Sequence, residues 1–191
     1  EQLNSLIHFR SYMGVDLAPL EKYSNLIVVA DYLGRAGPQE GSAYTYRTFQ
    51  VLDVLRELSE VATLAVVSNG VHKVQTRRLA ESGVSNFMED VFISEKLGCE
   101  KPGARIFDAA LRALGVENRE HVLVVGDGLS SDIQGGVNAG LDTCWYNPSH
   151  AENPGKVVPT YEIADLKELY PLVMEPEELA NLGQKHRRHQ C

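Results

Sequence analysis

The sequence predicts an α/β fold with a doubly wound parallel sheet and a partial helical cap segment. Short apolar runs rich in β-branched residues recur along the chain, segments with helical periodicity separate them, and clusters of Gly, Ser and Asn mark the boundaries. Because parallel strands need crossover connections, this alternation is typical of a sheet covered by helices on both faces.

The predicted strands are unbroken apolar runs, as expected for strands buried on both faces. They comprise Thr63–Val67, Val122–Val125 and Thr143–Tyr146. The segment Asn25–Ala30, NLIVVA, fits either a buried strand ending at Asp31 or part of a helix reaching Leu33. Short apolar runs do not distinguish the two, so both alternatives stay open.

The predicted helices carry apolar side chains at helical spacing, and glycine follows several of them as a C-terminal stop. They span Thr48–Ser59, His72–Ser82, Ala104–Leu114, about Ser130–Ala139 and about Ala164–Tyr170, the last limited by Pro171. Gly135 and Gly136 fall inside one of them and indicate close packing, because glycine costs about 1 kcal/mol relative to alanine in a helix.

These elements divide the chain into three parts. Residues 1–45 form a helical, cap-like segment, residues 46–173 the α/β core, and residues 174–191 a solvated polar tail. Because the sequence begins with Glu1 rather than Met, we expect further residues upstream.

Composition excludes several classes of protein. The chain has 191 residues and a formal net charge of −8, so it lacks the basic stripe of a protein that binds nucleic-acid polymers. Without an apolar run of transmembrane length or a signal peptide, we expect no membrane association. Three widely spaced cysteines predict reduced thiols in a cytoplasmic protein. No pattern indicates an oligomeric state.

Two acids follow the predicted strand Val122–Val125, within the stretch GDGLSSDIQGG. Asp127 and Asp132 therefore lie where open α/β sheets bind ligands, beyond the carboxyl ends of the strands. Neighbouring carboxylates repel unless a positive charge lies between them, and Mg²⁺ is typically held by one or two carboxylates, water and phosphate oxygens. The alternative is structural, with Asp127 as a turn residue and Asp132 complementing the helix dipole.

Further polar residues are predicted at the same edge of the sheet. Ser68 and Asn69 follow the strand Thr63–Val67, and Lys101 precedes the helix that starts at Ala104. A hydroxyl, an ammonium group, two acids and helix N-termini together favour a site for phosphate and a metal ion. Taken singly, Ser68 fits a turn and Lys101 fits the surface.

Three stretches resemble motifs of the haloacid dehalogenase (HAD) superfamily, above all its phosphatase branch with pyrimidine 5′-nucleotidase-like members. They are Val66–Gly70 (VVSNG), Lys101-Pro102 with the RIFDAAL that follows, and Gly126–Gly140. The resemblance implies a Rossmann-like core. It also implies a Mg²⁺-dependent phosphomonoester hydrolase that acts on a nucleotide or sugar phosphate through an aspartyl-phosphate.

The resemblance also implies roles for individual residues. Ser68 would hydrogen-bond the phosphoryl group, Lys101 would stabilise its charge, and Asn69 would help to position substrate. Asp127 would ligate Mg²⁺, with Asp132 beside it directly or through water.

The family's first motif, D-x-D-G-T after the central strand, is absent from these 191 residues. That motif supplies the nucleophile, and the candidate here is Asp31 in VVADYLG, with Leu33 where the second acid belongs. Asp31 could equally end a cap-region helix. The absence fits either a chain missing its first strand or a degenerate member. In the first case, NLIVVA or a partner would have to fill the gap between the strands that end at Ser68 and Val125.

Three rival functions follow. A catalytically degenerate HAD-like module would bind phosphate or a protein without turnover. A 2-haloacid dehalogenase needs no metal, which would leave Asp127 and Asp132 without a cation. A receiver-like regulatory domain expects its acids after the first strand and its lysine after the last, which is not the order here.

Overall fold

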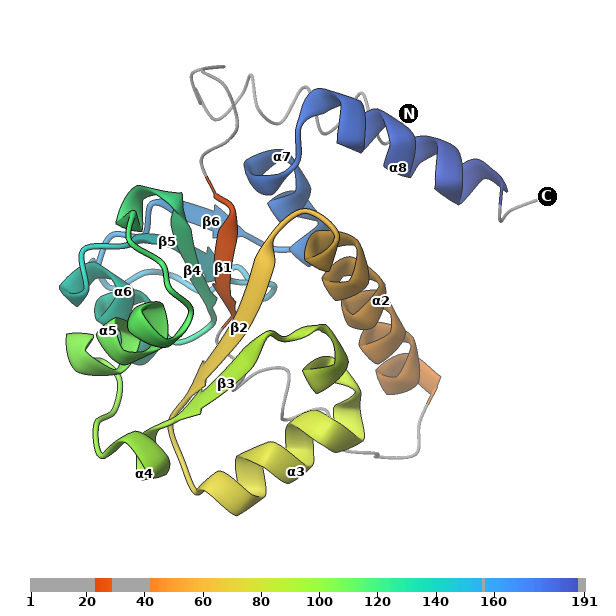
Figure 1. The fold of residues 1–191 in the computed structure, drawn as a ribbon. Coiled ribbons are helices and arrows are strands. Elements are labelled where there is room, and N and C mark those ends of the chain that lie inside the picture. Colours follow the sequence, from red (N-terminus) through yellow and green to blue (C-terminus); the bar gives the residue numbers. More distant parts are fainter. Residues whose placement is uncertain (1–22, 29–41, 156, 189–191) are drawn as a thin grey trace.

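A computed structural model describes residues 23–28, 42–155 and 157–188, and within them six strands form one parallel sheet (Figure 1). The strand order is β3-β2-β1-β4-β5-β6. The strands are β1 (Asn25–Val28), β2 (Thr63–Ser68), β3 (Asp90–Ile93), β4 (Val122–Gly126), β5 (Asp142–Tyr146) and β6 (Tyr161–Ile163). The predicted doubly wound α/β fold is confirmed.

Helices connect the strands, and α3 and α5 lie close to where the sequence predicts them. The α-helices are α2 (Ser42–Ser59), α3 (His72–Ser82), α4 (Ser94–Leu97), α5 (Ala104–Ala113), α6 (Gln134–Asn138), α7 (Tyr170–Val173) and α8 (Pro176–Arg188). Shorter helical turns are η2 (Val84–Phe87), η3 (Arg119–His121), η4 (Leu129–Ile133) and η5 (Leu166–Leu169). Among the described helices, none is both long and apolar enough to cross a membrane.

The segment NLIVVA contributes the central strand, so the strand alternative is the correct one for Asn25–Val28. Leu26 lies opposite Leu64 of β2 on one side and Leu123 of β4 on the other. The gap between those two strands is therefore filled by this chain. The remainder of the predicted cap-like segment up to residue 41, including Asp31, lies outside the described residues, apart from Tyr23 and Ser24.

Both faces of the sheet are buried, which explains the unbroken apolar runs. Along β4, Leu123 and Val125 face a core cluster shared with α2 and α7, whereas Val122 and Val124 face a second cluster shared with α5. Figure 1 shows α2 on one side of the sheet and α5 and α6 on the other.

Two predicted helix boundaries differ from the structure. Helix α2 begins at Ser42 rather than Thr48, inside the part assigned to the cap-like segment. Pro171 lies in the first turn of α7 rather than ending a helix, because proline is tolerated where no helical partner for its nitrogen is needed.

The predicted solvated tail from Glu175 onward instead forms helix α8. Its Leu179 is 6% exposed and belongs to the same core cluster as Met174, which is 2% exposed. Burial of these apolar side chains holds the helix on the core, although its sequence is polar overall. Figure 1 shows α8 following α7 at the end of the chain, at the upper right of the view.

The paired glycines of α6 confirm the predicted close packing. A Cβ atom at Gly135 would lie 2.6 Å from Cε2 of Phe107, and one at Gly136 would lie 2.6 Å from Cγ2 of Thr143. Both distances are below van der Waals contact, so α6 approaches α5 and β5 more closely than any larger residue allows.

Candidate functional site

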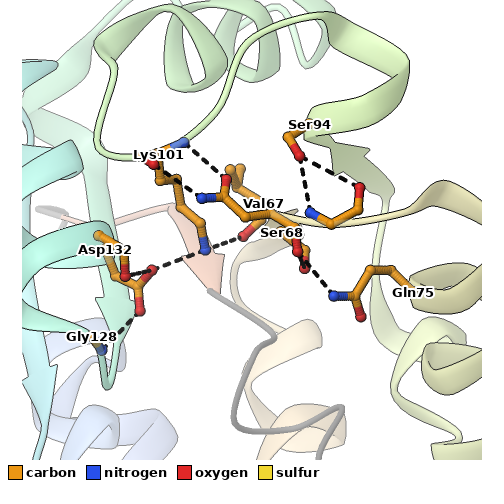
Figure 2. A network of polar contacts seen from close by, with 10 residues as sticks. Val67, Ser68, Gln75, Ser94, Lys101, Gly128 and Asp132 are labelled. Atoms are coloured by element: carbon orange, nitrogen blue, oxygen red, sulfur yellow. Dashed lines mark hydrogen bonds and ion pairs between the residues drawn. The ribbon is translucent and has the colours of Figure 1, made fainter.

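The predicted site residues come together at the carboxyl ends of β2 and β4. Ser68 is the last residue of β2 and is 1% exposed, and Asp127 directly follows β4. Lys101 lies between α4 and α5, and its side chain reaches Val67 of β2 and Asp132 in the turn after β4 (Figure 2). Parallel strands bring these ends to one edge of the sheet, where doubly wound folds bind their ligands.

Lys101 and Asp132 form a buried ion pair at this edge. Nζ of Lys101 lies 2.9 Å from Oδ1 of Asp132, and their side chains are 0% and 1% exposed. The ammonium group also donates to the carbonyl oxygen of Val67 at 3.1 Å. The Lys101 ammonium therefore links β2, through Val67, to the turn η4 that follows β4, through Asp132.

The loop after β4 places the Asp132 carboxylate. The amides of Asp132 and Ile133 both donate to the carbonyl of Gly128, and this wide turn, η4, directs the side chain of Asp132 back toward the strand. Its Oδ2 accepts from the amide of Gly128 at 2.9 Å, and Oδ1 accepts from the hydroxyl of Ser131 at 3.0 Å. A Cβ at Gly126 would lie 2.5 Å from Cβ of Asp132, so the glycine makes room for this approach.

Asn69 contacts the backbone of Lys101 with both ends of its side-chain amide. Its Nδ2 donates to the Lys101 carbonyl at 3.0 Å, and its Oδ1 accepts from the Lys101 amide at 2.9 Å. The two residues are 32 positions apart in the sequence. Ser68 Oγ lies 3.3 Å from the carbonyl oxygen of Asn69, to which it donates. The structure thus brings Ser68, Asn69, Lys101 and Asp132 into one network.

Asp127 is one of the residues that line a pocket of about 690 Å³, between α2 and the ends of β5 and β6. The indole nitrogen of Trp145 donates to the carbonyl oxygen of Asp127 at 3.0 Å. Trp145 is 4% exposed and lines the same pocket. From the sequence, Trp145 is predicted only as a residue of the strand Thr143–Tyr146. Its contact with Asp127 could not be predicted, because the sequence TCWY does not indicate which group accepts from the indole N–H.

The sequence also missed the residues that hold the turn after β2. Gln75 Nε2 donates to the carbonyl of Asn69 at 3.0 Å, and Ser94 Oγ accepts from the amide of Gly70 at 2.9 Å (Figure 2). The carboxylate of Glu95 accepts from the amide of His72, the first residue of α3, at 2.7 Å. In the sequence Gln75 is an ordinary residue of the predicted helix His72–Ser82, and Ser94 lies outside the predicted helices, so no signal marks either residue.

Asp127 and Asp132 are the two acids at this edge of the sheet that could ligate a divalent cation. Both oxygens of Asp132 already accept from donors, and the Lys101 ammonium supplies a positive charge beside it. Within the described ranges, no three His, Cys, Asp or Glu side chains gather as a metal cluster. Mg²⁺ requires fewer protein ligands than that, since water and substrate phosphate complete its octahedron, and Asp127 supplies one carboxylate at this edge.

Comparison with known proteins identifies related sequences and structures. A family model described as haloacid dehalogenase-like hydrolase matches residues 26–140. The putative HAD-hydrolase YfnB of Bacillus subtilis is 41% identical over 121 residues, covering 63% of this chain and 52% of that protein. The pyrimidine 5′-nucleotidase YjjG of Escherichia coli is 39% identical over 122 residues, covering 64% of this chain and 54% of that protein.

Solved structures show the same fold. The magnesium-bound crystal structure of YfnB superposes with a TM-score of 0.62 at 31% identity, covering 90% of this chain and 80% of that one. A 2-haloacid dehalogenase from Pseudomonas syringae superposes with a TM-score of 0.56 at 34% identity, covering 70% of this chain and 53% of that one. The chain spans about half the length of the curated relatives it matches.

Proposed function

Because the chain belongs to the haloacid dehalogenase-like hydrolases, we propose that it acts as a Mg²⁺-dependent phosphomonoester hydrolase on a small phosphorylated metabolite. The observation that carries this proposal is the buried Lys101–Asp132 ion pair beside Ser68, with Asp127 at the same edge of the sheet. A 5′-nucleotidase among the relatives supports a nucleotide as one substrate class, with sugar phosphates as the other.

In this proposal Ser68 and Lys101 bind the phosphoryl group. The Ser68 hydroxyl ends β2 and can turn from the Asn69 carbonyl to a phosphate oxygen. The Lys101 ammonium, removed from water and held by Asp132 and Val67, stabilises the negative charge that develops on the phosphoryl oxygens. Its position is set before substrate arrives, so little reorganisation opposes the reaction.

The residues present fit one Mg²⁺ ion. We assign Asp127 as its direct ligand and Asp132 as a partner through water, because both Asp132 oxygens are engaged in the Lys101 network. When bound, Mg²⁺ would neutralise phosphate charge and orient the ester. The indole N–H of Trp145 donates to the Asp127 carbonyl oxygen at 3.0 Å. This bond fixes the Asp127 backbone, from which the carboxylate projects.

The aspartyl-phosphate route requires a carboxylate that attacks phosphorus. A carboxylate oxygen would bond to phosphorus as the phosphorus–oxygen ester bond breaks, and the leaving alcohol oxygen would take its proton from water. A second water would then attack the acyl phosphate, which releases inorganic phosphate and restores the carboxylate. Asp31 follows the central strand β1 by three positions in the sequence and is the candidate nucleophile; it lies outside the described residues.

The test is hydrolysis of p-nitrophenyl phosphate, nucleoside monophosphates and sugar phosphates by this chain, with Mg²⁺ and with EDTA. We expect turnover that EDTA abolishes and that Asp127→Ala and Asp31→Asn each remove. Asp90→Asn is the matched control, because Asp90 begins β3 at the opposite edge of the sheet. Turnover without metal, or full turnover in Asp127→Ala, contradicts the proposal.

The second candidate is a non-catalytic HAD-like module that binds phosphate or a protein. The absence of D-x-D-G-T from these 191 residues favours it. Mg²⁺-dependent binding of inorganic phosphate without turnover of any ester, measured by calorimetry, would select this candidate over the hydrolase.

A further inference from the structure

We propose that Asn69 is a positioning residue that fixes the backbone of Lys101 and thereby aims its ammonium group, rather than a residue that contacts substrate. This inference deepens the proposed function and rests on it for the catalytic consequence. The geometric part stands on contacts alone: both polar atoms of the Asn69 side chain bind the Lys101 backbone, at 2.9 and 3.0 Å.

The paired hydrogen bonds act as a clamp on one residue. A carboxamide that donates to a carbonyl and accepts from the amide of the same residue fixes both the position and the rotation of that residue's backbone. From this anchored backbone the Lys101 side chain runs to Val67 O and Asp132. Lys101 is therefore attached to the end of β2 at its backbone and at its ammonium (Figure 2).

Asn69 can serve as an anchor because its own turn is held from several directions. Gln75 of α3 donates to the Asn69 carbonyl at 3.0 Å, and Ser94 of α4 binds the amide of the next residue, Gly70, at 2.9 Å. Gly70 has a φ of 135°, a conformation that residues with a side chain rarely adopt. The turn after β2 therefore has a defined backbone conformation. Because Asn69 is part of this turn, its side chain holds Lys101 from a fixed position.

The same contacts argue against a direct role for the Asn69 side chain in binding substrate. Its Oδ1 and Nδ2 both have backbone partners at ordinary hydrogen-bond lengths, and a substrate would have to displace one of them. Displacement would leave a backbone group of Lys101 without its partner, which costs more than a new bond to a solvated ligand returns.

The first measurement does not depend on catalysis. The buried Lys101 ammonium is protected from amine acylation, so its labelling by succinimidyl acetate, read by mass spectrometry, reports how firmly it is held. With exposed Lys73 as internal standard, we expect Asn69→Ala to raise the relative labelling rate of Lys101 about tenfold, as two lost hydrogen bonds imply. Asn69→Asp retains the acceptor for the Lys101 amide and gives an intermediate rate.

Asn118→Ala is the matched control. The Asn118 side chain also accepts from a backbone amide, that of Glu120 at 3.0 Å, but it precedes β4 at the other edge of the sheet. The Asn118→Ala variant therefore loses a comparable hydrogen bond that does not involve Lys101. The labelling rate of Lys101 in this variant should equal that of the unmodified chain. If Asn69→Ala does not fold, as judged by circular dichroism, the Lys101 labelling rate of Asn69→Asp is compared with that of Asn118→Ala instead.

The second measurement is steady-state hydrolysis. A misplaced ammonium weakens charge stabilisation in the transition state, so Asn69→Ala should lower kcat and leave KM within about twofold. Unchanged Lys101 labelling in a folded Asn69 variant overturns the proposal, and a raised KM with unchanged kcat would show that Asn69 contacts substrate instead. Faster Lys101 labelling in a chain that hydrolyses no ester supports the clamp and refutes the proposed function.

Discussion

Breaking the Lys101–Asp132 ion pair from the lysine side should destabilise the fold strongly. Lys101→Met keeps the length of the side chain but removes the ammonium 2.9 Å from Asp132, whose side chain is 1% exposed. A buried charge left without its partner costs about 3–5 kcal/mol of the free energy of unfolding. Gly128 and Ser131 still donate to the carboxylate, so we expect the lower part of this range.

Removing the acid should cost more. Asp132→Ala leaves the Lys101 ammonium buried, and it also deprives the Gly128 amide of its acceptor at 2.9 Å. An unsatisfied buried amide adds about 1–3 kcal/mol. In the double variant with Lys101→Met no charge remains buried, so its loss of stability should fall clearly below the sum of the two single losses.

The assay is urea unfolding followed by circular dichroism, with the two single variants and the double variant forming a cycle. Arg77→Met is the control, because the Arg77–Glu81 pair has side chains 77% and 52% exposed and should change stability within experimental error. A Lys101→Met loss below about 1 kcal/mol, or additive losses in the double variant, would refute the reasoning.

Three further predictions follow from single contacts. Trp145→Phe removes the N–H that holds the Asp127 carbonyl, and should raise the Mg²⁺ concentration for half-maximal hydrolysis about tenfold; an unchanged metal titration contradicts this role. Gly136→Ala forces a Cβ to 2.6 Å from Thr143 and should lower the free energy of unfolding by about 1–3 kcal/mol in urea. Burial raises the pKa of Tyr170, so the folded state keeps its phenol protonated where the unfolded chain ionises. Tyr170 should therefore lower the free energy of unfolding above about pH 10, by up to ~1.4 kcal/mol per pH unit. Tyr170→Phe should remove this contribution from the slope in urea titrations at several pH values, while buried Tyr23 and Cys144, whose pKa values are also raised, keep theirs.

Much of the site could be predicted because it follows strand ends. Ser68 and Asp127 occupy the residues where apolar runs stop, and parallel strands bring such positions to one edge. The positive partner of Asp132 could not be predicted in the same way. The sequence indicates that a positive charge must lie near two close acids, but Lys101 as that partner of Asp132 emerges only when α5 and η4 are placed against the same strands.

By itself the sequence determined the alternation of buried strands and helices, the carboxyl-edge location of Ser68, Lys101, Asp127 and Asp132, and the need for glycine in α6, because these depend on local pattern and connectivity. The tertiary structure alone decided that Asn25–Val28 is the central strand and that α8 packs through Leu179. Short apolar or polar runs are compatible with several conformations, and only the neighbours that bury them select one.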